Sequence, residues 1–404
     1  MHYLGQLLSQ NYLNHPAFSF GAMEIGVDTN KIEMFNELKL AADKIGNRGN
    51  QSKEISKELR FCLDDIFSEL KGGVIDKNEE QFISELHRES ARLLESELDW
   101  LKKKKDYFSN FHNKQNLKNT ISLLNHRFFL GQIDNDEIVK LQQLARKDIK
   151  KFKANALQGK TKREELSINS GSTIRSIVKI LNRAFSRAGV LDAVSTYMGV
   201  KMRVSGAALE LSVPSASWWK NGITGLNRAP NSLYAHLDES IEFPKSIMYL
   251  SDVKESNGPT SYYPTIYEEA YLNPLQEIIG RVVGIVGSAD TSPLKKFYGK
   301  TYHQSMTSEN FRRHFMRLPY ELRFNSHFGW DVMPGSELET QLVSKEIKML
   351  GSAGKFIVFD GAKLLHRGGL VEDGDRVALQ IIFSSYNIKS TAKRVINKLK
   401  VLRK

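Results

Sequence analysis

Residues 353–384 read Ala353-Gly-Lys-Phe-Ile-Val-Phe-Asp-Gly-Ala-Lys-Leu-Leu-His366-Arg-Gly-Gly-Leu-Val-Glu-Asp-Gly-Asp-Arg376-Val-Ala-Leu-Gln-Ile-Ile-Phe-Ser384. Two apolar, β-branched runs bracket a turn rich in glycine and acid, which predicts two strands joined by a loop. His366 follows the first strand and Arg376 opens the second. This stretch therefore predicts a β-rich unit that carries an imidazole and a guanidinium near its strand ends.

A second polar motif lies upstream, in Tyr234-Ala-His236-Leu-Asp238. On a strand, residues i and i+2 point to the same face, so His236 and Asp238 could hold one ion together. His366 would add a second imidazole, and two histidines with one carboxylate form the facial triad of non-heme Fe(II) oxygenases. A His-x-Asp tripeptide alone is a weak signal. The alternative is that both histidines are hydrogen-bonded core residues and that Asp238 is a turn residue.

These motifs resemble those of the phytanoyl-CoA dioxygenase family of Fe(II)/2-oxoglutarate-dependent oxygenases. The resemblance covers roughly the C-terminal 220 to 230 residues and rests on the segments 234–238, 252–260 and 354–383. It implies a double-stranded β-helix, that is, a jelly-roll or cupin-like barrel. It also implies Fe(II) held by His236, Asp238 and His366, with 2-oxoglutarate and O2 as co-substrates. Arg376 would bind the far carboxylate of 2-oxoglutarate, because guanidinium pairs with carboxylate through two parallel hydrogen bonds.

The chain departs from the family pattern beside the co-substrate site. Ala378 stands where a hydroxyl side chain is common, two positions after Arg376. We expect Tyr234 and Thr260 to contribute to cofactor binding. Ser232 and Met248 are further candidates for the pocket. Each of these four residues is equally compatible with ordinary sheet packing.

The N-terminal part of the chain has a helical pattern instead. Apolar residues recur at three- and four-residue steps from about residue 31 to 159, and Gly72-Gly73 ends one such stretch. The pattern through Leu117, Ile121, Leu124 and Phe128 is also read as helix. We therefore predict an α+β chain with an α-helical domain at 1–160, the barrel domain at 161–388 with an insertion at about 265–350, and a basic amphipathic tail at 389–404.

Composition limits the possible partners. The net charge is +12, but seven Lys or Arg residues without any acid lie in the tail at 389–404, so the remaining chain carries about +5. We expect no nucleic-acid binding by the body of the protein. The single cysteine, Cys62, and the lack of a signal-peptide pattern predict a cytoplasmic location. The basic tail could add peripheral contact with an anionic membrane surface, or it could simply be solvated.

The predicted function is oxidation, most simply hydroxylation, of a small or carrier- or lipid-linked substrate with release of succinate and CO2. Two alternatives stay open. One is a non-catalytic binding or scaffold protein on the same barrel. The other is an oxygenase that acts on a protein or RNA, which the helical part and the basic tail would bind. The sequence leaves the substrate and the oligomeric state undetermined.

Overall fold

The chain folds into helices and two antiparallel sheets in the computed structural model, which describes residues 4–15, 24–45, 49–108, 117–160, 162–214, 228–238, 244–264, 272–284, 294, 297 and 308–385. The predicted tail at 389–404 lies outside these residues. The described helices are α1 (Leu4–Asn14), α2 (Thr29–Ile45), α3 (Gly49–Gly72), α4 (Lys77–Phe108), α5 (Leu117–His126), α6 (Asn135–Leu157), α7 (Arg163–Leu166), α8 (Gly171–Arg187), α9 (Val190–Met198), α11 (Pro274–Gly284), α13 (Glu309–Phe315) and α14 (Glu337–Lys345).

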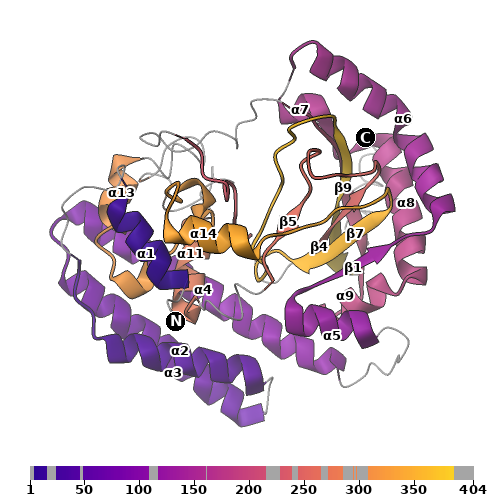
Figure 1. Cartoon of the computed structure of the whole chain (residues 1–404). Coiled ribbons are helices and arrows are strands. Elements are labelled where there is room, and N and C mark those ends of the chain that lie inside the picture. The colour runs from indigo at the N-terminus through magenta and orange to yellow at the C-terminus, as the bar shows by residue number, and fades with distance from the viewer. Residues whose placement is uncertain are drawn as a thin grey trace, which may run out of the picture.

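The larger sheet has six strands in the order β1-β7-β4-β9-β3-β2, and a smaller sheet has the order β6-β5-β8 (Figure 1). Every neighbouring pair is antiparallel. The combination confirms the predicted α+β class. The strands are β1 (Phe128–Gln132), β2 (Ser167–Ile168), β3 (Met202–Ser212), β4 (Pro244–Tyr249), β5 (Ser261–Tyr262), β6 (Ile347–Lys348), β7 (Lys355–Asp360), β8 (His366–Arg367) and β9 (Arg376–Ser385).

Side chains of the larger sheet alternate between two environments, as the two-residue period of a strand requires. On β9, Val377 and Leu379 belong to a core shared with helices, whereas Arg376 and Ala378 line a cavity on the other face. On that second face, a smaller core joins residues of the larger sheet to Tyr262 of β5. The two sheets therefore enclose the cavity between them, which is the arrangement that a double-stranded β-helix needs.

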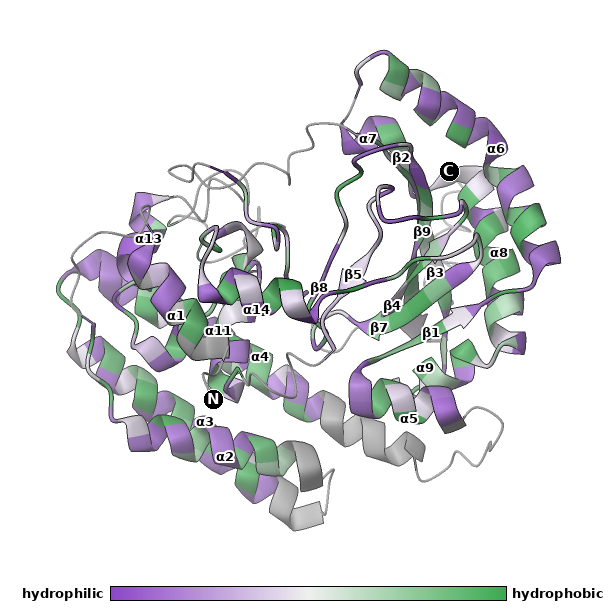
Figure 2. Cartoon of the chain, viewed as in Figure 1, coloured by the Kyte–Doolittle hydropathy of each residue, from purple (hydrophilic) through white to green (hydrophobic). Residues whose placement is uncertain are grey.

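Helices α6, α8 and α9 cover the outer face of the larger sheet, and α8 and α9 contact β3 (Figure 1). Strands β4 and β7 are largely hydrophobic in Figure 2, and helix α8 carries both hydrophobic and hydrophilic residues, as expected for a helix that packs one face on a buried sheet. The helical interpretation of Phe128 was wrong. Helix α5 ends at His126, and Phe128 starts β1, which pairs with β7. Pairing with a strand more than 200 residues away leaves no local signal in the sequence.

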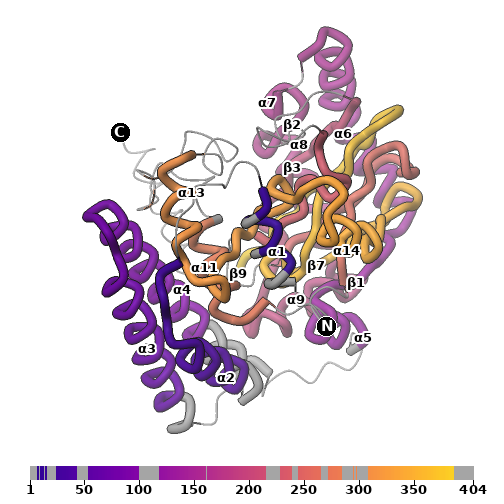
Figure 3. Tube along the Cα trace, turned by 60° about the vertical axis from the view of Figure 1, so that its left-hand side comes forward, coloured from indigo at the N-terminus to yellow at the C-terminus, as the bar shows by residue number. Residues whose placement is uncertain are grey.

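The described residues up to 108 contribute to a third core, distinct from the two cores of the larger sheet. They share it with residues of the segment between β5 and β6. Leu63 of α3 and Leu86 of α4 pack in the same cluster as Ile279 of α11 and Phe315 of α13. Figure 3 shows α2, α3 and α4 along one flank of the molecule, beside α11. Within the predicted insertion, α11 and α13 thus pack on the N-terminal helices. Residues 117–160 instead pack on the larger sheet, while the domain boundary predicted at 160 stays a prediction.

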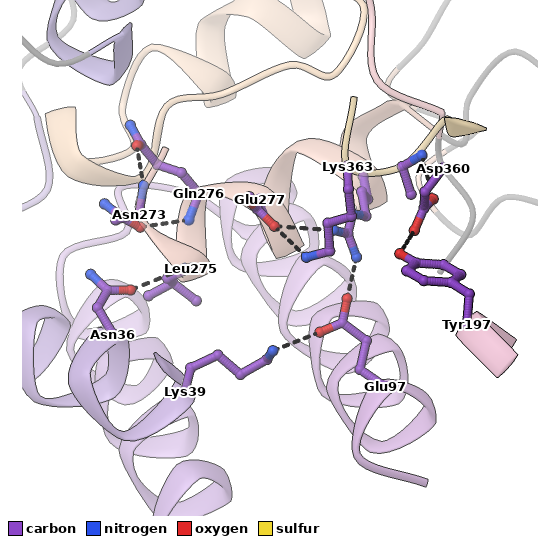
Figure 4. A network of polar contacts seen from close by, with 12 residues as sticks. Asn36, Lys39, Glu97, Tyr197, Asn273, Leu275, Gln276, Glu277, Asp360 and Lys363 are labelled. Carbon is purple, nitrogen blue, oxygen red and sulfur yellow. Dashed lines mark hydrogen bonds and ion pairs between the residues drawn. The ribbon is translucent and has the colours of Figure 1, made fainter. Parts of the chain in front are cut away.

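Buried charged side chains connect the N-terminal helices to the loop between β7 and β8 (Figure 4). Glu97 of α4 accepts from Lys39 of α2 at 3.2 Å and from Arg281 of α11. Glu277, one turn before Arg281, accepts from Lys363 at 2.9 Å. All five side chains are buried. Because Lys363 lies in the loop between β7 and β8, this network connects the N-terminal helices to the loop that leads to His366.

A membrane-spanning helix is absent from the described ranges: none of their helices combines the necessary length with the necessary hydrophobicity.

Candidate metal centre

The backbone brings the two predicted histidines side by side. His236 forms an isolated antiparallel bridge with His366, in which each amide donates to the other residue's carbonyl oxygen at 3.0 and 3.1 Å. The imidazole centroids lie 4.3 Å apart as a result. The amide of Asp238 donates to the carbonyl oxygen of Gly361 at 2.8 Å, which fixes the carboxylate next to both rings. Residues far apart in the sequence thus meet at one end of the cavity.

Both imidazoles are oriented by their own backbone. Nδ1 of His236 lies 2.8 Å from the carbonyl oxygen of Tyr234, and Nδ1 of His366 lies 2.8 Å from that of Leu364. Because a carbonyl oxygen only accepts, Nδ1 carries the proton in each ring. Each neutral ring then presents a lone pair on Nε2, which is the state that a metal ligand requires.

The ligand atoms of His236, Asp238 and His366 all lie within 4.8 Å of one another. Oδ1 of Asp238 is 3.7 Å from Nε2 of His236 and 3.7 Å from Nε2 of His366. Nε2 of His366 is buried, and among the described residues it has no hydrogen-bond partner. A buried acceptor without a donor is costly, and a metal ion at this point would satisfy it. The three side chains therefore fit a metal ion with two nitrogen ligands and one oxygen ligand.

Burial keeps both imidazoles neutral. It lowers the pKa of His236 from its ordinary value to about 4, and it lowers the pKa of His366 well below the ordinary value. For Asp238 burial alone would raise the pKa, but the neighbouring Lys245 ammonium and the two histidines together hold this pKa below its ordinary value. All three ligands are consequently in their metal-binding protonation state at neutral pH.

We expect metal affinity to change little between about pH 7.5 and pH 5.5. Two imidazoles with ordinary pKa values would lose roughly 100-fold over that range, because protons compete for both nitrogens. With the pKa of His236 at about 4, protonation expels the metal only at lower pH. Because the folded pKa is below the unfolded one, the metal-free protein should also lose stability as the pH falls from about 6.5 towards 4.

Titration with Co(II), followed by visible absorbance at several pH values, measures this profile. A loss of affinity that begins near pH 6.5 would contradict the expected burial of the two rings.

One cavity of about 300 Å³ is lined by the predicted metal ligands and by the predicted co-substrate residues. Its wall includes the three candidate ligands together with Arg376, Tyr234 and Thr260. Met248 instead faces the helix-side core, and Ser232 does not line this cavity. Strand alternation explains the orientation of Met248, because its neighbours Ile247 and Tyr249 point between the sheets.

Arg376 is held in place from two sides. Its Nη1 donates to the carbonyl oxygen of Gly258, and its Nη2 donates to the hydroxyl of Ser212 on the neighbouring strand β3 at 3.1 Å. Burial lowers the pKa of Arg376, whereas Tyr249 and Glu210 act in the opposite direction. A guanidinium fixed in this way is a cation suited to a carboxylate, although two of its donors already have protein partners.

Comparisons with known proteins find only distant structural likeness. No protein-family model matches the chain, and no curated protein matches it. Among solved structures, apo EctD from S. alaskensis matches with 14% identity over 68% of this chain and 80% of EctD, at a TM-score of 0.37. The non-heme alpha-ketoglutarate-dependent epimerase SnoN from nogalamycin biosynthesis matches with 12% identity over 67% of this chain and 82% of its own, at 0.33.

HygX from Streptomyces hygroscopicus, solved with nickel and 2-oxoglutarate bound, matches with 10% identity over 68% of this chain and 88% of HygX, at a TM-score of 0.31. Likeness at this level does not transfer a reaction to the present chain. The chemistry has to be argued from its own residues.

Three residues beside the triad were not singled out from the sequence. Lys245 of β4 donates to Asp238 at 2.9 and 2.6 Å. His327 stacks on His236 with the centroids 4.9 Å apart. Gly361 leaves space for the carboxylate, since a Cβ atom there would lie 1.7 Å from Oδ2 of Asp238. Strand alternation could have indicated Lys245, because it shares the inward face of β4 with Ile247; the other two positions carried no usable signal.

Proposed function

We propose that this chain is an Fe(II)- and 2-oxoglutarate-dependent oxygenase, similar to the phytanoyl-CoA dioxygenase family, that hydroxylates a small or carrier-linked substrate. One observation carries the proposal. Two neutral imidazoles and one carboxylate converge on a point where Nε2 of His366 is buried without a partner among the described residues. This donor set is typical of non-heme Fe(II) sites and leaves coordination positions open.

Each group has a role in this proposal. His236, Asp238 and His366 would hold Fe(II), and Arg376 would bind the far carboxylate of 2-oxoglutarate. Iron and 2-oxoglutarate with O2 supply oxidation of a C–H bond, with succinate and CO2 as co-products. The protein positions the reactants and keeps water away, and Ile247 and Phe359 provide apolar wall for that purpose. Tyr234 and Thr260 are proposed to contact the co-substrate from the same wall.

The size of the cavity supports a small substrate or one end of a larger one. At about 300 Å³ it lies at the lower limit of ligand pockets, so a co-substrate and a modest reacting group would fill it. A carrier or lipid chain would then extend outside. Action on protein or RNA, cytoplasmic location and membrane contact through the tail stay predictions.

A non-catalytic barrel is the second candidate, and one contact favours it. Lys245 already places a cation on Asp238, so this carboxylate is satisfied without a metal ion. A protein that had lost its metal could retain the barrel with such an ion pair. The candidates differ in an observable way, because only an oxygenase releases succinate.

The test is an anaerobic titration of purified protein with Fe(II) and 2-oxoglutarate, followed by addition of oxygen. We expect a weak visible charge-transfer band and then succinate, with the Arg376→Met variant needing at least roughly 30-fold more 2-oxoglutarate, the effect of removing one partner of a buried charge pair. Arg313→Met, which removes an exposed guanidinium bound to Glu309, should behave as wild type. Iron-loaded wild-type protein that shows neither band nor succinate would favour the non-catalytic barrel.

A further inference from the structure

Lys245 is in direct contact with Asp238, the carboxylate among the three candidate metal ligands. Its Nζ lies 2.9 Å from Oδ1 and 2.6 Å from Oδ2 of Asp238, so the ammonium bridges both oxygens. Strand β4 dictates this position. Lys245 is the register partner of Phe359 on β7, and its Nζ lies 5.1 Å from the centre of that ring. The aromatic face provides a second favourable contact for the cation.

The ammonium changes the charge of the centre. Two neutral imidazoles and the Asp238 carboxylate would carry one negative charge, and Lys245 cancels it. Glu210 is the other carboxylate on the described part of the cavity wall, and it is bound to Arg163 at 2.9 Å and to Gln380 at 2.8 Å. The negative charge of Glu210 therefore does little to compensate the positive charge of Lys245. A divalent metal ion that entered alone would add two positive charges to a partly desolvated site whose wall already carries the Arg376 guanidinium.

We propose that Lys245 couples metal binding to the binding of a dianionic co-substrate, so that the two ligands bind as a pair. This inference rests on the proposed function. A dicarboxylate would bring one negative charge to the metal ion and one to Arg376, and the metal ion would in turn favour the dicarboxylate. Without the dicarboxylate, the Lys245 ammonium competes with the metal ion for Asp238. The coupling is reciprocal, because each ligand must change the affinity of the other by the same factor.

The ion pair also restricts how Asp238 can bind a metal ion. Oδ1 is the oxygen that lies 3.7 Å from both Nε2 atoms, whereas Oδ2 makes the shorter contact with Lys245. Lys245 can stay on Oδ2 while Oδ1 serves as the ligand, which favours a single metal–oxygen bond. The competition therefore weakens the bond to the metal ion but does not require the lysine to leave.

Lys245→Met tests the proposal, because methionine keeps the length of the side chain and removes the charge. Co(II) affinity is measured by visible absorbance without oxygen, with and without saturating 2-oxoglutarate, in the full chain. For wild type we expect 2-oxoglutarate to tighten Co(II) binding by at least about tenfold, the lower effect of one charge within 4–6 Å. Without 2-oxoglutarate, Lys245→Met should bind Co(II) at least about tenfold more tightly than wild type does. The factor by which 2-oxoglutarate tightens Co(II) binding should be smaller in the variant by the same amount.

Two control variants separate the charge from other effects. Lys245→Arg keeps the charge and should retain most of the coupling. Lys348→Met removes a charge that lies near Glu255 at 3.6 Å, outside the cavity, and should leave both Co(II) affinities unchanged. Equal coupling factors in wild type and Lys245→Met would overturn this inference and leave the oxygenase proposal intact. Failure of both proteins to bind Co(II) under any condition would overturn the metal site and the inference together.

Discussion

Replacing His366 with alanine is expected to lower Fe(II) or Co(II) affinity by more than about 100-fold, since loss of a group that merely supports a ligand already costs 10- to 100-fold. The substitution removes the Nε2 atom that lies buried without a partner among the described residues, 3.7 Å from Oδ1 of Asp238. Only one imidazole and the carboxylate would remain of the three ligands. We therefore also expect succinate release to fall below detection.

His327→Ala is the matched control for this experiment. His327 is a buried histidine that stacks on His236, but its Nδ1 lies 3.0 Å from the hydroxyl of Ser326, and it does not belong to the group of converging ligand atoms. Its loss should cost no more than about tenfold in affinity, the lower end for a supporting residue. Anaerobic titration of Co(II) by visible absorbance compares the variants. If metal binding survived His366→Ala but was lost in His327→Ala, His327 and not His366 would be the second histidine ligand.

The substitution with the largest expected effect on stability is Glu97→Gln. The Glu97 carboxylate is shared by Lys39 and Arg281, and all three side chains are buried. Burial alone would raise the pKa of Glu97, but Lys39, Arg281 and Lys363 together hold it below its ordinary value. Removing one member of a buried charge network costs about 3–5 kcal/mol of unfolding free energy.

Glu95→Gln provides the comparison on the same helix. Glu95 is exposed and pairs with the partly exposed side chain of Arg60, so its loss should cost less than about 1 kcal/mol. Urea unfolding monitored by circular dichroism measures both free energies. Similar midpoints and slopes for the two variants would show that the buried network contributes little to stability.

The sequence predicted those parts of the site that depend on local pattern. The two strands predicted within residues 353–384 are confirmed at β7 and β9, because apolar runs bounded by turns identify strands locally. The pairing of His236 with His366 across the chain places both rings in one site with Asp238, as the motif spacing had suggested. Their roles in catalysis stay predictions.

Long-range pairing explains what the sequence could not supply. Phe128 fits a helical stripe by periodicity, yet it lies in β1 because β7 offers an edge for pairing. Lys245 is the second residue of β4, and only the three-dimensional approach of Asp238 gives it a partner. The same holds for Glu97 and Lys363, which are buried only because the helices and the loop between β7 and β8 pack together.

We expect the buried network to affect when the metal centre forms during folding. Lys363 lies three residues before His366, and the partner that it binds, Glu277, is connected through Arg281 to Glu97 on α4. Contacts between such distant parts of the chain form late, because their loop-closure cost is met only after local structure exists. Helices α2, α3 and α4 precede β7 and β9 in the chain, so they are synthesised before the strands on either side of the His366 loop. The loop that carries His366 reaches its final position only when nearly the whole chain has assembled, so metal capture should mark the end of folding.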